Sequence, residues 1–422
     1  MSFVNQKRKE MKHSISHLIQ RTPKKIEISL NGKNIILVGN NGAGKTVFLR
    51  KINNALSDIF QSKNILNHDE ILAEYEKAQI NAELAKGDSR QHVRFRDNSK
   101  YFLNELEKRK ELDILFSDTA STLLLLNEGG LIFRFFEAYR NYANTDINLL
   151  TSIDGLFESF QSQTRFNVNN STVSNYFEKY LVSMSNYALL EKGAGEELEY
   201  RRVTEIIDGI EKDLRDLFDD ENLKLIFNRK NLRMQISQKN KNPFGFDVLP
   251  SGFSSILAIY SELIMLTELS KNKKSEVRGI VLIDEIDAHL HVSLQKKVFE
   301  FFSSSFPNIQ FIISTHSPFV VQSVSNAIIY NLSTNEKLED LSIYSYASIV
   351  KGLLGEETNS KILEQDLDEL SSLVCEKKFN DRFFTLVSLL QDKIDELDPR
   401  AKSILLNARS SLLDWQQESD NV

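Results

Sequence analysis

One eight-residue stretch has the residue types and the spacing of a phosphate-binding loop. Residues 39–46 read Gly-Asn-Asn-Gly-Ala-Gly-Lys-Thr and match G-x-x-x-x-G-K-[ST] at every fixed position. Glycines let the backbone turn tightly and direct its N–H groups at phosphate oxygens. A lysine here can reach the β- and γ-phosphates, and the following hydroxyl can bind Mg²⁺. We therefore expect ATP and Mg²⁺ as cofactors, bound by Gly39, Asn40, Asn41, Gly42, Ala43, Gly44, Lys45 and Thr46, rather than a glycine-rich turn that binds nothing.

Two adjacent acids supply the second part of the predicted chemistry. Asp284 and Glu285 end an apolar run, Ile280-Val281-Leu282-Ile283. Beside a phosphate-binding loop, the first acid is expected to hold Mg²⁺, usually through water. The second can orient or deprotonate the attacking water. The alternative is that the acids only cap the helix that follows.

Two further positions could contact phosphate. His316 follows the apolar strand 310–315, at the end where open α/β sheets bind ligands, and its imidazole could hydrogen-bond the γ-phosphate. Ser251-Gly252 precedes a strongly apolar helix, and a helix N-terminus attracts anions. Since the chain already has one complete phosphate loop, a second anion site suggests a composite site that two subunits share. A plain helix N-cap is the alternative for Ser251.

The elements that must position these residues are strands with short connections. Residues 34–38 form an apolar run that leads into the loop, and a helix follows to about residue 60. Residues 24–30 alternate apolar and polar, and Asn31-Gly32 predicts a hairpin turn that pairs them with 34–38. Further strands are predicted at 130–137, 223–228, 232–237, 280–285 and 310–315.

Most of the interval between the two parts of the core reads as helix. Residues 67–116 predict a helical hairpin, and helices are expected at 145–160, 172–191 and 196–218. The hairpin carries a basic run, which allows nucleic-acid binding but is more typical of a solvated helix face. Its basic residues are Arg90, Arg94, Arg96, Lys100, Lys108, Arg109 and Lys110, and Arg134 and Arg140 flank the strand at 130–137 as further candidates for the site.

Composition is that of an ordinary globular protein. The 422 residues carry a net charge of −7, so no global basic field recruits nucleic acid. The single cysteine, Cys375, excludes an internal disulfide framework and suits a reducing compartment. We find no run of 18 apolar residues and expect a cytoplasmic protein with no membrane span. Residues 1–21 read as a polar, flexible arm, and 341–422 as three helices (362–373, 379–397 and 401–415) for docking or assembly.

The order of the motifs resembles a known family. The phosphate loop, a long insertion, Leu-Pro-Ser-Gly, Ile-Asp-Glu, Asp-Ala-His-Leu-His and Ser-Thr-His-Ser-Pro resemble the ABC-type ATPases of the RecF and SMC branch. Within that branch the chain looks closest to the standalone ATPases of bacterial anti-phage defence, the Septu ATPases and their retron-associated relatives. The likeness covers about 24–60 and 223–333. Phe253 stands where transporters have a second glycine, and no Q-loop glutamine is assigned. The resemblance implies that Gly39–Thr46 is Walker A, Asp284 and Glu285 are the Walker B acid and catalytic glutamate, Ser251-Gly252 is the signature, Asp287–His289 is the D-loop and His316 is the switch histidine.

The resemblance also implies a fold and a function. We expect an α/β P-loop ABC-type ATPase head with a mixed sheet flanked by helices. Its core would be 1–60 and 223–340, its mainly helical insertion 61–222, and its C-terminal helical segment 341–422. The expected function is an ATPase that forms composite sites in a homo-oligomer built from dimers and controls a separate effector, a nuclease, in phage defence. The alternatives are a RecF/SMC-like repair ATPase that binds DNA, and a scaffold that binds ATP structurally.

Overall fold

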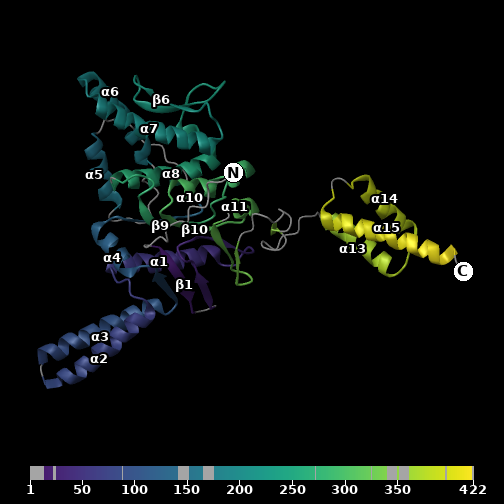
Figure 1. Cartoon of the computed structure of the whole chain (residues 1–422), viewed down its shortest axis with the longest axis horizontal. Coiled ribbons are helices and arrows are strands. Elements are labelled where there is room, and N and C mark those ends of the chain that lie inside the picture. The colour runs from purple at the N-terminus through teal and green to yellow at the C-terminus, as the bar shows by residue number, and fades with distance from the viewer. Residues whose placement is uncertain are drawn as a thin grey trace, which may run out of the picture. The chain divides into compact units, whose positions relative to one another are not determined.

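The computed structural model describes residues 14–21, 25–87, 89–140, 152–164, 175–270, 272–324, 326–339, 349–350, 361–394 and 397–420. Two compact units are present, Met1–Ile349 and Val350–Val422, and each is considered by itself. Figure 1 labels their helices and strands.

A six-stranded sheet forms the centre of the first unit, in the order β12-β11-β3-β10-β9-β5. Its strands are parallel except β12, which is antiparallel to β11. Strand β3, in the middle, is buried at every residue, which is why it reads as an unbroken apolar run. The predicted α/β fold with a mixed sheet flanked by helices is confirmed. The strands are β3 (Asn34–Val38), β5 (Leu131–Phe136), β9 (Arg278–Ile283), β10 (Ile309–Ser314), β11 (Ala327–Asn331) and β12 (Glu336–Glu339).

A second, antiparallel sheet has the order β2-β1-β4, with β1 at Ile15–Gln20, β2 at Ile26–Ser29 and β4 at Leu112–Phe116. The predicted pairing of 24–30 with 34–38 is wrong, because β2 pairs with β1 while β3 lies in the central sheet. The tight turn at Asn31-Gly32 does form, with φ of 49° and 74°, but it joins strands of two different sheets. The two strands differ in burial. Strand β2 is buried only at alternate residues, as in a sheet with one exposed face, whereas every residue of β3 is buried, as in the middle of a parallel sheet that is covered on both faces.

Residues 14–21 belong to the fold and are not the flexible arm that we predicted. Within them, β1 is the middle strand of its sheet, and the fully buried Gln310 of β10 links it to the central sheet. The Gln310 side chain accepts a hydrogen bond from Ile15 N (2.8 Å) and donates to the carbonyl of Lys33 (2.8 Å). Apolar residues of both sheets and of helix α1 (Lys45–Ser62) form one core around this link. Residues 1–13 lie outside the described residues.

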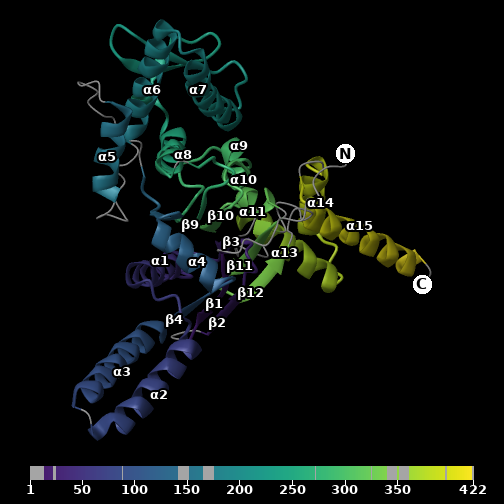
Figure 2. The same ribbon diagram turned by 60° about the vertical axis from the view of Figure 1, so that its left-hand side comes forward.

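Helices α2 (His68–Leu84) and α3 (Ser89–Arg109) form the predicted hairpin, joined by a 3₁₀ turn at Ala85–Gly87. They lie side by side in both views (Figures 1 and 2). The predicted extension of the helical hairpin to residue 116 is wrong, because 112–116 is strand β4. Its side chains are largely buried in the two-sheet core, and that tertiary environment outweighs the helical spacing of the leucines before it.

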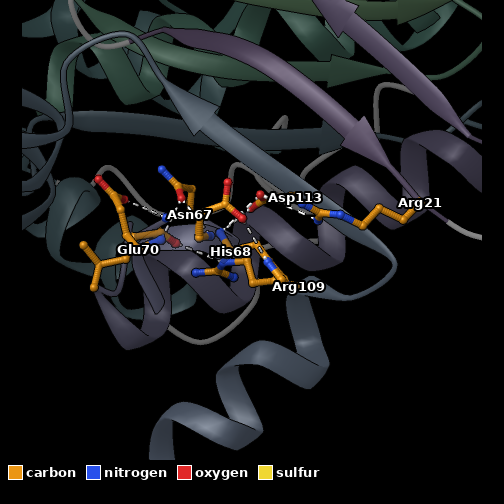
Figure 3. Close-up of polar contacts among 8 residues, drawn as sticks. Arg21, Asn67, His68, Glu70, Arg109 and Asp113 are labelled. Carbon is orange, nitrogen blue, oxygen red and sulfur yellow. Dashed lines mark hydrogen bonds and ion pairs between the residues drawn. The ribbon is translucent and has the colours of Figure 1, made fainter. Parts of the chain in front are cut away.

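The root of the hairpin is a buried polar cluster (Figure 3). Both carboxylate oxygens of Asp113 accept a hydrogen bond from His68 N, at 3.2 Å each, where α2 begins. Arg109, 2% exposed, donates to the carbonyls of Asn64 (2.7 Å) and Leu66 (3.2 Å), just beyond α1. Burial raises the pKa of the Asp113 carboxyl and lowers that of the Arg109 guanidinium. The hairpin is therefore fixed to the strand and to the end of α1 by satisfied buried groups.

The remaining helices of the first unit cover the central sheet and extend from it. Phe299 and Phe302 of α10 pack against Phe311 of β10. Helix α8 is long and apolar enough to cross a membrane, but 78% of that stretch is buried inside the fold, as in a core helix. The predicted helices at 145–160, 172–191 and 196–218 correspond to α5, α6 and α7, although 145–151 and 172–174 lie outside the described residues. The elements are α4 (Thr119–Glu128), α5 (Ile153–Thr164), α6 (Asn175–Ala194), α7 (Glu197–Phe218), α8 (Ser251–Leu269), α9 (Val292–Gln295), α10 (Val298–Ser305), α11 (Pro318–Gln322) and an antiparallel sheet of β6 (Lys224–Asn228), β7 (Arg233–Ser237) and β8 (Phe244–Gly245).

The described residues of the second unit form three helices, as predicted: α13 (Lys361–Cys375), α14 (Asp381–Asp392) and α15 (Pro399–Asp420). Leu367, Phe383 and Leu405 contribute to a core of their own. Cys375 is exposed at the end of α13. The docking or assembly role of this unit stays a prediction.

Candidate nucleotide site

The glycine loop follows β3 and has the backbone that its sequence predicts. Gly39, Gly42 and Gly44 have φ of 143°, 80° and 88°, values that favour glycine. Helix α1 begins directly after Gly44, and no side chain caps its N-terminus. The first-turn N–H groups are thus available to an anion.

Ser333, just after β11, is a contact of this loop that the sequence did not reveal. Its hydroxyl accepts a hydrogen bond from Asn40 N at 2.9 Å. A Cβ at Gly39 would stand 2.9 Å from the same hydroxyl, so position 39 requires glycine for close approach as well as for its φ. Only the small polar residues after an apolar strand at 327–331 could have indicated this contact.

Lys45 is turned into its own loop and is 6% exposed. Its Nζ donates to the carbonyls of Gly39 (2.8 Å) and Asn40 (3.3 Å). Burial lowers the pKa of the Lys45 ammonium, while the negative charges of Glu285 and Asp284 act in the opposite direction. The structure therefore brings the predicted lysine and the two predicted acids within electrostatic range of one another. Thr46 follows Lys45 in the first turn of α1 and is partly exposed.

Asp284 and Glu285 lie just beyond the end of β9, in a turn that Ser314 fixes. The Ser314 hydroxyl donates to Asp284 Oδ1 (2.5 Å) and accepts from Glu285 N (2.8 Å). Asp284 N donates to the carbonyl of Phe136 at the end of β5 (2.8 Å). Glu285 has φ of 46°, a left-handed conformation that costs free energy for a residue with a Cβ. The acid predicted to bind metal is buried, whereas Glu285 is partly exposed.

Arg140 holds the main chain of this turn from the loop after β5. Its guanidinium donates to the carbonyls of Asp284 (2.7 Å), Glu285 (2.9 Å) and Glu137 (2.7 Å). Burial lowers the pKa of Arg140 to about 10, so the side chain remains charged at neutral pH. Its Nε is buried without a hydrogen-bond partner. Of the two arginines flagged by the sequence, this one is in the site.

Arg134 has a different role. Its Nε donates to Glu262 of α8 at 2.7 Å, and this buried pair joins β5 to α8. Burial raises the pKa of Glu262 to about 7, and the charge of Arg134 opposes that rise. Arg134 therefore positions an element of the core, and among the described residues its hydrogen bonds go to Glu262 and to the carbonyl of Phe133 rather than to the acidic turn.

His316 and Asp287 lie in the connections that follow β10 and β9. Thr315 Oγ1 donates to Asp287 (2.5 Å) and accepts from Ser317 N (2.9 Å). His316, between Thr315 and the start of α11, is partly exposed, and within the described part of the chain its ring has no hydrogen-bond partner. The imidazole is thus placed beside the acidic turn without being used in the fold.

Ser251 and Gly252 begin α8. A Cβ at Gly252 would stand 2.6 Å from the carbonyl of His289, so only glycine permits this approach. His289 itself has φ of 64°. Ser251 is exposed and, among the described residues, makes no hydrogen bond with the glycine loop of the same chain. Phe253, the departure from the transporter signature, stacks on Phe218 with ring centroids 4.3 Å apart.

A protein-family model described as "AAA domain, putative AbiEii toxin, Type IV TA system" matches residues 35–322. That span runs from β3 to α11 and includes the loop, both acids and His316. The chain belongs to this AAA-domain family.

Curated relatives of this AAA-domain protein agree with the resemblance predicted from its motifs. Septu protein PtuA of Bacillus mycoides (strain KBAB4) is 25% identical over 383 residues, 88% of this chain and 47% of that protein. "Retron Vc95 probable ATPase" of Vibrio cholerae is 25% identical over 361 residues, 72% of this chain and 69% of that protein. The chain spans about half the length of the Septu relative (47%). Among solved structures, an SMC head bound to the C-terminal winged-helix domain of ScpA covers 78% of this chain and 98% of its own, at 14% identity and a TM-score of 0.37.

The donor set of the AAA domain fits a nucleotide with Mg²⁺. Added Cβ atoms at Gly42 and Gly44 meet nothing within 4 Å, so there is open space beside the loop at these two positions. The hydroxyl of Thr46 and the carboxylate of Asp284 are hard oxygen donors, which Mg²⁺ prefers. Within the described residues no group of three or more His, Cys, Asp or Glu could hold a metal alone.

Proposed function

We propose that this chain binds ATP with Mg²⁺ and hydrolyses it to ADP and phosphate. The observation that carries the proposal is the burial of Lys45 in an open glycine loop, beside Asp284 and Glu285. A cation, free N–H groups and two carboxylates at one edge of a sheet are the parts that phosphoryl transfer needs. The match to an AAA-domain family supports the proposal.

Each residue of the site has a role in the proposed reaction. Lys45 exchanges its hydrogen bonds to the loop carbonyls for the β- and γ-phosphates, and the first turn of α1 adds its N–H groups. Thr46 and Asp284 would hold Mg²⁺, which would supply charge neutralisation at the phosphates. Glu285 orients the attacking water and accepts its proton. His316 hydrogen-bonds the γ-phosphate.

The proposal extends to an assembly in which two copies complete each other's sites. Ser251 starts a helix whose N-terminus has no side-chain cap, and Ser251 is exposed. In the proposed dimer, Ser251-Gly252 of one copy binds the γ-phosphate held by the glycine loop of the other. ATP binding then favours the closed pair, and hydrolysis releases it. The similarity to the Septu and retron relatives supports a role in anti-phage defence, in which we propose that the cycle controls a separate effector nuclease.

The first test is phosphate release by purified chains. Lys45→Ala should weaken ATP binding and remove turnover, because the γ-phosphate loses its cation. Glu285→Gln should retain ATP binding with kcat reduced at least ~100-fold, because the water loses its base. Glu300→Gln on the exposed face of α10 removes the same charge away from the site and should leave kcat unchanged. Full turnover by Glu285→Gln would remove Glu285 from the mechanism.

The second test asks whether the sites are shared. Lys45→Ala and Ser251→Arg should each be inactive alone, because every site in either dimer contains a lesion. A dimer that contains one copy of each variant has both lesions in one of its sites and none in the other. Equimolar mixing should then restore about a quarter of wild-type activity, since half of the dimers regain one of two sites. A mixture that stays inactive, with ATP binding by Ser251→Arg intact, would contradict the shared site.

A further inference from the structure

The hairpin of α2 and α3 exposes more apolar surface than two solvated helices require. Leu84 is 80% exposed, Ile80 59% and Val93 49%. Single exposed apolar residues are ordinary, but a group of them on one small element marks an interaction surface. The exposed large apolar side chains of the two helices are Leu72, Ile80, Leu84, Val93, Tyr101 and Leu103.

The charges of the hairpin are separated by helix. Helix α2 carries five acidic residues and one basic residue. Helix α3 carries six basic residues and three acidic ones. The hairpin therefore presents an acidic edge beside a basic edge.

A groove of about 560 Å³ runs between the two helices on one side. Glu76, Ile80 and Glu83 line it from α2, at the four- and three-residue spacing of one helix face. Arg96 lines it from α3, and Lys100 lies one turn farther along that face. Acidic, apolar and basic side chains thus share one side of the hairpin.

The opposite charges do not neutralise each other across the groove. Between described residues, the ion pairs within the hairpin, such as Glu74 with Lys77 and Glu105 with Lys108, join residues of the same helix. Glu76, Glu83 and Arg96 form no ion pair with any described residue. Both signs of charge are therefore available to a partner.

We propose that this face of the hairpin binds the same face of a second copy of the chain, forming a four-helix bundle. A two-fold axis parallel to the helices sets α2 of each copy against α3 of the other, so acids meet bases and the apolar residues are covered. A two-fold axis across the helices would set α2 against α2, and like charges would oppose it. The charges thus select one arrangement, with both tips pointing the same way.

Nucleic acid fits this face less well. Phosphates would be attracted to α3 but would meet Glu76 and Glu83 along the other side of the groove. Contact with the sugar–phosphate backbone would also leave Ile80 and Leu84 uncovered. A second copy satisfies both helices at once. This contact requires no nucleotide and is separate from the ATP-dependent dimer proposed above.

The test measures molar mass by light scattering, without nucleotide and in a Lys45→Ala background, so the ATP-dependent dimer does not contribute. The parent should show twice the chain mass of 48.5 kDa. Arg96→Glu/Lys100→Glu makes both sides of the groove acidic, and Glu76→Arg/Glu83→Arg makes both sides basic. Each variant alone should associate at least ~10-fold more weakly, because like charges now face each other. An equimolar mixture should associate again, because each acidic hairpin can pair with a basic one.

The mixture also shows that both variants are folded. Lys239→Glu/Lys241→Glu, in the exposed loop before β8, makes the same charge change elsewhere and should keep the parent mass. A mixture that remains at the single-chain mass would overturn the proposal. So would a parent of single-chain mass that binds duplex DNA through Arg96 and Lys100, an outcome that assigns the face to nucleic acid.

Discussion

Replacing Arg140 with methionine tests whether a residue outside the motifs sets the geometry of the acidic turn. Arg140 is 5% exposed, and its guanidinium donates to three carbonyls, two of which belong to Asp284 and Glu285. Methionine fills similar volume but donates nothing. The carbonyls would then have to turn toward water, and the left-handed Glu285 would lose a support.

The structure sets the expected size of the effect. A hydrogen bond from a charged donor contributes about 1.5–3 kcal/mol, and removing a buried charged partner typically costs about 3–5 kcal/mol in total. We expect the free energy of unfolding to fall by about that amount. A shift of the Glu285 carboxylate by about 1 Å reduces kcat by about 100-fold. ATP binding should change little, because the hydrogen bonds of Arg140 to described residues go to Glu137, Asp284 and Glu285 and not to the glycine loop.

Steady-state phosphate release and nucleotide titration separate these effects. Arg140→Lys retains the charge but cannot span three carbonyls, so its kcat should lie between those of Arg140→Met and the parent. Arg134→Met is the matched control, since it breaks a buried ion pair of the same strand region without touching the turn. It should lower stability with kcat unchanged below its unfolding temperature. If Arg140→Met lost stability but kept the parent kcat, Arg140 would be a structural residue only.

Three further substitutions test neighbouring parts of the structure. Gly252→Ala should lower the free energy of unfolding by about 1–3 kcal/mol, because its Cβ would stand 2.6 Å from the carbonyl of His289. By contrast, Gly209→Ala should raise that free energy by about 0.5–1 kcal/mol, because position 209 lies inside α7 with open space for a Cβ and alanine favours a helix over glycine. Urea unfolding measures both changes. Glu262 has a pKa raised to about 7, so the folded state binds its proton more tightly than the unfolded state. Its contribution to stability should decline from about pH 4.5 to about pH 7, and Glu262→Gln should lack this decline in urea titrations across that range. Arg109→Met should lower stability by about 3 kcal/mol through the loss of two charge-assisted hydrogen bonds, with faster amide exchange at the root of the hairpin.

Sequence reasoning succeeded where a local pattern is sufficient. The apolar run 34–38 and the glycine loop lie within a few residues of each other, so strand, loop and helix could be placed without any long-range information. The acids after β9 were found in the same way. The turn at Asn31-Gly32 misled because a tight turn specifies local backbone, not which sheet receives the next strand. Pairing of β2 with β1 depends on burial that only the assembled core defines.

The sequence already named Arg140 and Gly252 as candidates, but the contacts that hold the site together depend on partners far along the chain. Arg140 acts on the carbonyls of residues 144 and 145 positions away, and a carbonyl has no sequence signature. Ser333 contacts Asn40 from 293 positions away for the same reason. Close approach at Gly252 likewise needs the position of the His289 carbonyl, which no spacing rule supplies.

One helix connects the proposed chemistry to the proposed interaction surface. Helix α1 starts at Lys45, and its 18 residues span about 27 Å before the chain reaches the carbonyls that Arg109 holds. A packed helix moves as a unit, so a displacement of its N-terminus toward phosphate must also appear at its other end. At that end, the buried contacts of Arg109 and Asp113 join the hairpin to the segment after α1, so we expect the hairpin to move with the helix. We therefore expect nucleotide binding to tilt the hairpin, and the association between hairpins to respond to ATP even though it does not require it.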